Sequence, residues 1–319
     1  MTAALVELDE VREAASRIRS VAAGTPLMAS EVLSEEIGAE VRLKCESLQR
    51  TGSFKIRGAY NYIAQLGADE LERGVITYSS GNHAQAVALG ARTAGVRAVV
   101  VMPTTAPAIK RRGAERLGAE IVLEGTTSIE RKARAEEISA REGLHIVPPF
   151  DHPWIIAGQG TVGLEVHEAW PEADTFFVPI GGGGLASGTA VAVRALRPDA
   201  RIYGVEPVGA ASMRAALDAG GPVTLDAIDT LADGLAPVRT GDLTYEHARE
   251  LLDDVWVVED RDILEAASLL LLRSKLVVEF SGAATVAALR ARGEMVAGHR
   301  VVAVLSGGNL DSSSIPELL

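Results

Sequence analysis

The chain has 319 residues, of which 47% are apolar and 23% charged, and its formal net charge is −12. This balance is typical of a soluble globular protein with one large or two ordinary domains, and the negative charge argues against nucleic acids and anionic membranes as partners. Cys45 is the single cysteine, which excludes an intramolecular disulfide, and the N-terminal segment has no secretory signal pattern, so we expect a cytoplasmic enzyme.

Short β-branched runs alternate with alanine-rich amphipathic segments along most of the chain. The predicted strands are 41–45, 75–79, 98–102, 120–123, 145–148, 175–179, 201–205, 255–258 and 301–305. The predicted helices between them include 84–94, 106–117, 129–141, 185–196 and 263–273. This alternation predicts an α/β fold whose parallel sheets are covered by helices with right-handed crossovers.

The strand–helix pattern has a seam near Pro148 and Pro149, and the run before it is compact enough to form a sheet of its own. We therefore predict two domains, each an open, mainly parallel twisted sheet flanked by helices. The large domain would comprise residues 1–70 and 148–319, and the small domain residues 71–147. A cleft between two such domains is a favoured place for a cofactor.

Lys55 lies in the first turn of a predicted helix whose apolar face is marked by Ile56, Tyr60 and Ile63. Ser53, two residues earlier, offers a hydroxyl to cap this helix. The positive end of the helix dipole disfavours an ammonium group and lowers its pKa, which makes Lys55 a nucleophile suited to an aldehyde. The alternative is a surface lysine whose stem extends past the helix end.

Two predicted strands are followed by loops that suit anions, at the carboxyl ends where ligands bind in open parallel sheets. The loop 79–83 (Ser-Ser-Gly-Asn-His) offers hydroxyl, amide and backbone N–H groups to a carboxylate, although a plain capped turn is an alternative. We expect His83 to be a packed, hydrogen-bonding histidine rather than a base. The loop 181–184 consists of four glycines before a helix, and its N–H groups and the helix dipole suit a phosphate.

Two further strand ends carry polar residues. Glu206 can cap a helix, orient a loop or bind a cation, and capping is the favoured interpretation. Ser306, followed by two glycines and an asparagine, can exchange a hydrogen bond with a ring nitrogen. The relaxed pattern Gly181-x-Gly183-x-x-Ala186, with Glu206 at the end of the next strand, also fits a dinucleotide-binding fingerprint, so a nicotinamide dehydrogenase is the alternative of a different class.

Six segments taken together resemble the fold-type II pyridoxal-phosphate enzymes, and within them the serine/threonine dehydratase and serine racemase family. In chain order they are 51–59, 79–83, 157–161, 181–184, 232–234 and 306–309. The resemblance extends from about Thr25 to Asn309. It implies a fold similar to the tryptophan synthase β subunit, pyridoxal 5′-phosphate as cofactor, an amino-acid substrate and a homodimer.

The resemblance also implies a role for each matching residue. Lys55 would be the Schiff-base lysine, and Ser80 matches the serine that faces the far side of the cofactor in the racemases. The other implied cofactor-binding residues are Phe54 beside the ring, Asn82 at the 3-oxygen, Gly181, Gly182, Gly183 and Gly184 around the phosphate, and Glu279 and Ser306 near the ring nitrogen. The substrate carboxylate would be received by Ser79, Ser80, Asn82 and His83.

Many members of this family bind a divalent cation through a glutamate, a backbone carbonyl and an aspartate. The matching residues here are Glu206, Ala210 and Ser212. Because Ser212 replaces a carboxylate, the site lacks one hard-oxygen ligand and its charge, so we expect Mg²⁺ or Ca²⁺ to bind weakly if at all.

The implied reaction is a β-elimination in which Lys55 removes the α-proton of the substrate. A neutral serine at the ring nitrogen limits the charge that the ring absorbs, which favours loss of a β-leaving group. We therefore expect a dehydratase (ammonia-lyase) that converts L-threonine or L-serine into a 2-oxo acid and ammonia. Serine racemase, with Ser80 delivering a proton to the opposite face, 3-hydroxyaspartate dehydratase and a β-replacement enzyme are alternatives on the same site.

Overall fold

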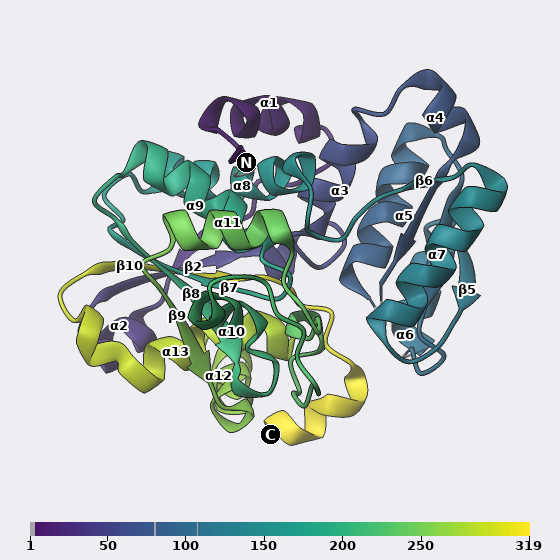
Figure 1. Ribbon diagram of the computed structural model, residues 1–319. Helices are drawn as coiled ribbons and strands as arrows, with labels where there is room; N and C mark the ends of the chain where they lie inside the picture. Colours follow the sequence, from purple (N-terminus) through teal and green to yellow (C-terminus); the bar gives the residue numbers. More distant parts are fainter. Residues whose placement is uncertain (1–3, 80, 107) are drawn as a thin grey trace.

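The computed structural model describes residues 4–79, 81–106 and 108–319. Its strands form two separate sheets, seen side by side in Figure 1. The larger sheet has six strands in the order β1-β2-β10-β7-β8-β9, and the smaller has four in the order β5-β4-β3-β6. Neighbouring strands are parallel except β1 and β2, so the predicted α/β class with mainly parallel sheets is confirmed.

The predicted strands are all present, within a few residues of the expected bounds. The larger sheet contains β1 (Leu27–Ala29), β2 (Glu40–Cys45), β7 (Thr175–Pro179), β8 (Arg201–Pro207), β9 (Asp254–Val258) and β10 (Arg300–Leu305). The smaller sheet contains β3 (Val75–Tyr78), β4 (Ala98–Met102), β5 (Glu120–Leu123) and β6 (His145–Ile146). Strand β1 was not predicted, because three residues are too few to show a periodic pattern.

We call residues 68–146, which contain the smaller sheet, the small lobe, and the rest of the chain the large lobe. The helices of the small lobe are α4 (Ala68–Arg73), α5 (Asn82–Ala94), α6 (Ala108–Arg116) and α7 (Ser128–Glu142). Those of the large lobe are α1 (Leu8–Ile18), α2 (Glu31–Ile37), α3 (Lys55–Ile63), α8 (Pro153–Ala169), α9 (Gly184–Leu196), α10 (Ser212–Ala219), α11 (Asp242–Leu251), α12 (Asp260–Leu272) and α13 (Phe280–Arg292). The smaller sheet lies inside the predicted interval 71–147, and the domain limits themselves stay a prediction.

The described residues also contain five short 3₁₀ segments: η1 (Glu46–Leu48), η2 (Val208–Ala210), η3 (Asp233–Leu235), η4 (Gly293–Val296) and η5 (Ser312–Leu318). Helices cover both faces of the larger sheet (Figure 1). Helix α13 packs against β7 to β10 on one face, and α9 packs against β7 with α8 and α11 beside it. No helix among the described residues is long and apolar enough to cross a membrane.

Glycines let α3, α8 and α9 approach one another closely. A Cβ added at Gly158 of α8 would lie 2.6 Å from the Cα of Gly58 in α3. One added at Gly188 of α9 would collide with the carbonyl oxygen of Ile156 and lie 2.5 Å from the nitrogen of Gly160, both in α8. These crossings hold α3 and α9 on either side of α8, and the first turns of α3 and α9 both open into one cavity.

Candidate active site

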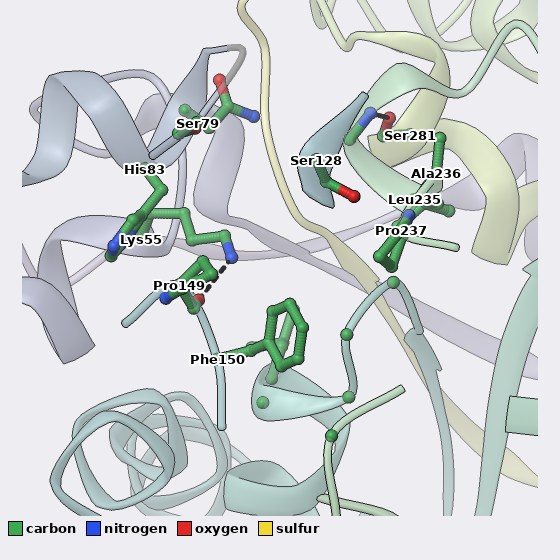
Figure 2. A pocket seen from close by; sticks show the side chains of 18 of the residues that line it. Lys55, Ser79, His83, Ser128, Pro149, Phe150, Leu235, Ala236, Pro237 and Ser281 are labelled. Atoms are coloured by element: carbon green, nitrogen blue, oxygen red, sulfur yellow. Dashed lines mark hydrogen bonds between the residues drawn. The ribbon is translucent and has the colours of Figure 1, made fainter. Parts of the chain in front are cut away.

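A cavity of about 430 Å³ lies between the two lobes and is lined by residues of both (Figure 2). It brings together most of the side chains that the sequence singles out: Phe54, Lys55, Ser79, Asn82, His83, Gly181, Gly182, Gly183, Gly184, Glu279 and Ser306. Ser80, predicted as a second catalytic residue, lies outside the described residues. Glu206 and Ala210 do not line this cavity.

Lys55 is the first residue of α3, and its Nζ donates a hydrogen bond of 2.9 Å to the carbonyl oxygen of Pro149 (Figure 2). Burial lowers the pKa of this amine to about 8, and no carboxylate in the described part of the chain pairs with it. The low pKa was expected from the helix dipole, and in the structure burial of the amine lowers it. The expected cap was wrong: Phe54 is the N-cap of α3, and the buried Ser53 hydroxyl has no hydrogen-bond partner among the described residues.

A buried ion network lies beneath the start of α3, centred on Arg57. Its guanidinium donates to Glu46 at 2.8 Å and to Glu165 at 2.6 Å, and Glu165 also pairs with Lys44 at 2.5 Å. Arg57 and Glu46 are completely buried. Because Arg57 is two residues beyond Lys55, this network fixes the turn that carries the amine. The sequence does not predict this network, because its members are up to 121 residues apart.

The predicted carboxylate loop leads into the N-terminus of α5, whose first residue is Asn82. The Asn82 amide donates to Glu279 at 2.5 Å, and its oxygen accepts from Asn309 at 2.8 Å. His83 is buried, and one ring nitrogen lies 3.2 Å from the Val147 carbonyl. Burial and the nearby Lys55 charge lower the pKa of His83 to about 3, so its ring is neutral at physiological pH.

The glycine loop 181–184 is shaped by contacts that a side chain would block. Gly183 is the N-cap of α9 with φ of +94°, and a Cβ there would lie 2.7 Å from the Cβ of Thr244. A Cβ at Gly182 would collide with the ring of Phe150, and the Thr244 hydroxyl donates to the Gly182 carbonyl at 2.7 Å. The first N–H groups of α9 have no intrahelical acceptors, so this bend is suited to a phosphate.

Glu279 and Ser306 place polar atoms in another part of the same cavity. Glu279 is 3% exposed, and its Oε2 has no hydrogen-bond partner among the described residues. Burial, followed by the charge of Asp233, raises the pKa of Glu279 to about 7. An amine for an aldehyde, a glycine cradle for a phosphate and polar groups for ring heteroatoms together fit pyridoxal phosphate.

The residues of the doubtful cation site are arranged differently. Both carboxylate oxygens of Glu206 accept backbone N–H groups at the start of α10, from Met213 and Arg214, each at 2.8 Å. Ser212 is the first residue of that helix. Glu206 therefore caps α10, and among the described residues no cluster of three or more His, Cys, Asp or Glu side chains could hold a metal ion.

The sequence interpretation gave no role to several charged residues of the cavity wall, among them Lys110, Arg131 and Asp233. Arg131, in the first turn of α7, is 9% exposed. Its Nη1 donates to the Thr126 carbonyl at 3.1 Å, and its buried Nε has no hydrogen-bond partner among the described residues. Within the described part of the chain, the side-chain contact of this guanidinium is with a backbone carbonyl and not with a carboxylate. A cation in the first turn of a helix is unusual, and this placement is the sequence feature that could have identified Arg131.

Comparisons with known proteins agree with this geometry. A family model described as pyridoxal-phosphate dependent enzyme matches residues 18–307. The chain is 42% identical over 315 residues to an L-threonine ammonia-lyase of Thermotoga maritima, covering 99% of this chain and 78% of the relative. It is 39% identical over 310 residues to an L-threo-3-hydroxyaspartate ammonia-lyase of a Pseudomonas species, covering 97% of each.

The solved structure of maize serine racemase superposes with a TM-score of 0.94 at 38% identity, covering 98% of this chain and 97% of that one. These matches confirm the predicted resemblance and the predicted cofactor, and they favour pyridoxal phosphate over a nicotinamide cofactor. The chain therefore belongs to the family of pyridoxal-phosphate dependent enzymes.

Proposed function

We propose that this enzyme is a dehydratase (ammonia-lyase) of β-hydroxy amino acids, which converts L-threonine or L-serine into a 2-oxo acid and ammonia. The proposal rests on one observation: the Lys55 amine lines the same cavity as the N-termini of α5 and α9. The two helix ends supply separate sites for a substrate carboxylate and a phosphate. The relation to an L-threonine ammonia-lyase at 42% identity supports this activity.

Pyridoxal phosphate, when bound, withdraws electrons from the α-carbon of an attached amino acid. Asn82 and the first N–H groups of α5 orient the substrate carboxylate. Lys55, whose pKa is about 8, has a sizeable unprotonated fraction at neutral pH and takes the α-proton at its Nζ. His83 stays neutral and does not compete for this proton. Loss of the α-proton and the β-hydroxyl releases water, and a second water then releases ammonia and the 2-oxo acid.

The test is a panel assay of the cofactor-loaded enzyme with L-threonine, L-serine, L-threo-3-hydroxyaspartate and a bulkier β-hydroxy amino acid. Release of 2-oxo acid is measured together with the chirality of the unreacted substrate. We expect 2-oxo acid from L-threonine or L-serine, and Lys55→Ala should abolish both turnover and the visible absorbance of the lysine-bound cofactor. Borohydride reduction that attaches the cofactor to another lysine, or racemisation without 2-oxo acid, would overturn the proposal.

A second candidate substrate, 3-hydroxyaspartate, is favoured by Arg131. This nearly buried guanidinium lines the cavity without a carboxylate partner in the described part of the chain, and a β-carboxylate of the substrate would supply one. Arg131→Gln should then lower kcat/KM for L-threo-3-hydroxyaspartate at least tenfold relative to L-threonine. Arg134→Gln is the matched control, because Arg134 lies on the same helix and pairs with Glu124 and Glu137. Equal losses on both substrates would refute the acidic-substrate assignment.

We also propose that the enzyme is a cytoplasmic homodimer. Leu48 and Val277 are each more than half exposed, and the Val277 carbonyl and Ser47, next to Leu48, both lie beside Gly308, so these two apolar residues stand on neighbouring segments of the surface. Such a surface is suited to a protein partner. Light scattering coupled to gel filtration should give twice the mass of one chain, and Leu48→Glu should shift the mass toward the monomer.

A further inference from the structure

One ion pair crosses the cavity from the small lobe to the large lobe. Lys110 of α6 reaches over the cavity, and its Nζ pairs with the carboxylate of Asp233 at the start of η3. Lys110 is 7% exposed, whereas about half of the Asp233 side chain is exposed. Every other ion pair between described residues stays within one lobe, so this contact is the single charged link between them.

The Lys110 side chain also contacts the loop that we assign to the substrate carboxylate. A Cβ added at Gly81 would lie 2.8 Å from the Cδ of Lys110 and 3.4 Å from its Cε. Glycine at this position therefore leaves room for the lysine stem, which packs against the loop backbone. The next residue, Asn82, makes its own link to the large lobe through Glu279.

Polar contacts thus join the lobes at two neighbouring points: Lys110 pairs with Asp233, and Asn82 bonds to Glu279 and Asn309. The loop that they hold belongs to the small lobe, whereas Lys55 belongs to the large lobe, at the start of the helix α3 that packs against α5. A substrate held by its carboxylate on one lobe can react with an amine on the other only if the lobes keep a fixed relative position. Misplacement of about 1 Å can cost on the order of a hundredfold in rate.

We propose that Lys110 is a positioning residue: its ion pair with Asp233 closes the small lobe onto the large lobe and holds the substrate loop in register with Lys55. The proposal rests on the proposed function for its catalytic consequence, but the closing contact itself does not depend on which substrate is used. Lys110 acts here through Gly81 and Asp233 and does not touch the reacting atoms.

The experiment compares the cofactor-loaded wild type with Lys110→Met, Asp233→Asn, the double variant and Lys110→Arg. Methionine keeps the stem that packs on Gly81 and removes only the charge. Amide hydrogen exchange is measured in residues 82–94 and 108–116, and kcat/KM is measured with the best substrate of the panel. Arg290→Met is the matched control, because it breaks the Arg290–Glu36 pair, which lies wholly in the large lobe.

Each single variant should raise exchange in both segments several-fold and lower kcat/KM at least tenfold. The double variant should be no worse than either single one, Lys110→Arg should retain most of the wild-type behaviour, and Arg290→Met should change neither readout. Unchanged exchange in Lys110→Met despite lost activity would overturn the proposal, since Lys110 would then act on the substrate directly. Independent, additive effects of the two single variants would also overturn it.

The exchange measurement separates this proposal from the proposed function. If no β-hydroxy amino acid is turned over, the function fails while exchange still reports whether the ion pair closes the lobes. If turnover is found but exchange is the same in all variants, the function stands and the closing role of Lys110 is wrong.

Discussion

Lys55 occupies a site that stabilises an ammonium group poorly. Its pKa is about 8 in the folded protein, and it returns to the ordinary value of 10.5 when the chain unfolds. Between pH 8 and 10.5 the Lys55 amine is protonated in the unfolded chain but not in the folded protein. The lysine therefore destabilises the fold to its full extent below pH 8, and this loss of stability decreases as the pH rises toward 10.5.

We predict that Lys55→Met stabilises the cofactor-free protein at pH 7. The expected gain is on the order of 2–3 kcal/mol at pH 7, and less than about 1 kcal/mol at pH 10. Urea unfolding of both proteins at the two pH values measures it. A gain that is the same at both pH values would show that the amine is not the cause. The amine to which we assign the chemistry would thus be kept at a cost in stability.

Residue-level inference from the sequence identified residues that line the cavity where the signal is local. Lys55 and the glycine loop 181–184 could be predicted because neighbouring residues define a helix start and a bend. Lys110 and Arg131 could not, because their importance depends on what faces them across the cavity. Asp233 is 123 residues from Lys110 in sequence, and no periodic pattern links the two.

At the scale of elements, the position of α3 depends on the buried network of Arg57, Glu46 and Glu165. Removing one partner of a buried ion pair leaves the other charge without compensation, which is more costly than never having buried the pair. The Glu46 carboxylate accepts two hydrogen bonds from Arg57, each 2.8 Å long.

We predict that Glu46→Gln lowers the free energy of unfolding by about 3–5 kcal/mol. Glu36→Gln is the control, because Glu36 pairs with Arg290 in a solvent-exposed setting, and its loss should cost less than about 1 kcal/mol. Denaturant unfolding at pH 7 measures both. Similar small losses in the two variants would mean that α3 is held by apolar packing alone.

The crossings of α3, α8 and α9 give a second element-scale prediction. Gly188→Ala places a methyl group against the backbone of α8, and overpacking of this kind costs about 1–3 kcal/mol. It should also weaken cofactor retention, because α9 carries the glycine loop at its start. Gly221→Ala, at a glycine with nothing within 4 Å of the added Cβ, should change neither property. Thermal unfolding and absorbance after dialysis test both variants.

Element boundaries were predictable to within a few residues, but strand order was not. The alternation of strands and helices predicts parallel sheets, and the break after 148 predicts that residues 71–147 form their own unit. Yet β10, the last strand, lies between β2 and β7 in the larger sheet. Its five buried residues after Arg300 indicate a central strand, but they do not indicate which neighbours it has.

At the scale of the whole molecule, two sets of buried groups make stability depend on pH in opposite directions. His83, His152 and His247 all have a lowered pKa, with burial as the first cause. The unfolded chain binds protons at these histidines below about pH 6.5, so their effect is a loss of stability on acidification. For His83, with a pKa of about 3, the loss at pH 5.5 is about 1.4 kcal/mol.

Glu206 and Glu279 act in the other direction. Burial raises the pKa of each to about 7, so the folded protein takes up protons between pH 7 and the ordinary value near 4.5. Their effect is a gain of stability on acidification through this range. We therefore expect the free energy of unfolding of the cofactor-free wild type to change little between pH 7.5 and 5.5, because the two sets oppose each other.

The opposing effects of the histidines and the glutamates on stability can be separated by replacing one of the two glutamates. Glu279→Gln keeps an oxygen for the Asn82 amide but cannot take up a proton, so its stability should fall by about 2 kcal/mol more than that of the wild type between pH 7.5 and 5.5. Urea unfolding of the cofactor-free proteins at the two pH values measures the difference, with the exposed Glu36→Gln as control. A Glu279→Gln profile parallel to the wild type would show that Glu279 is already ionised at pH 5.5, and that its surroundings stabilise the carboxylate despite burial.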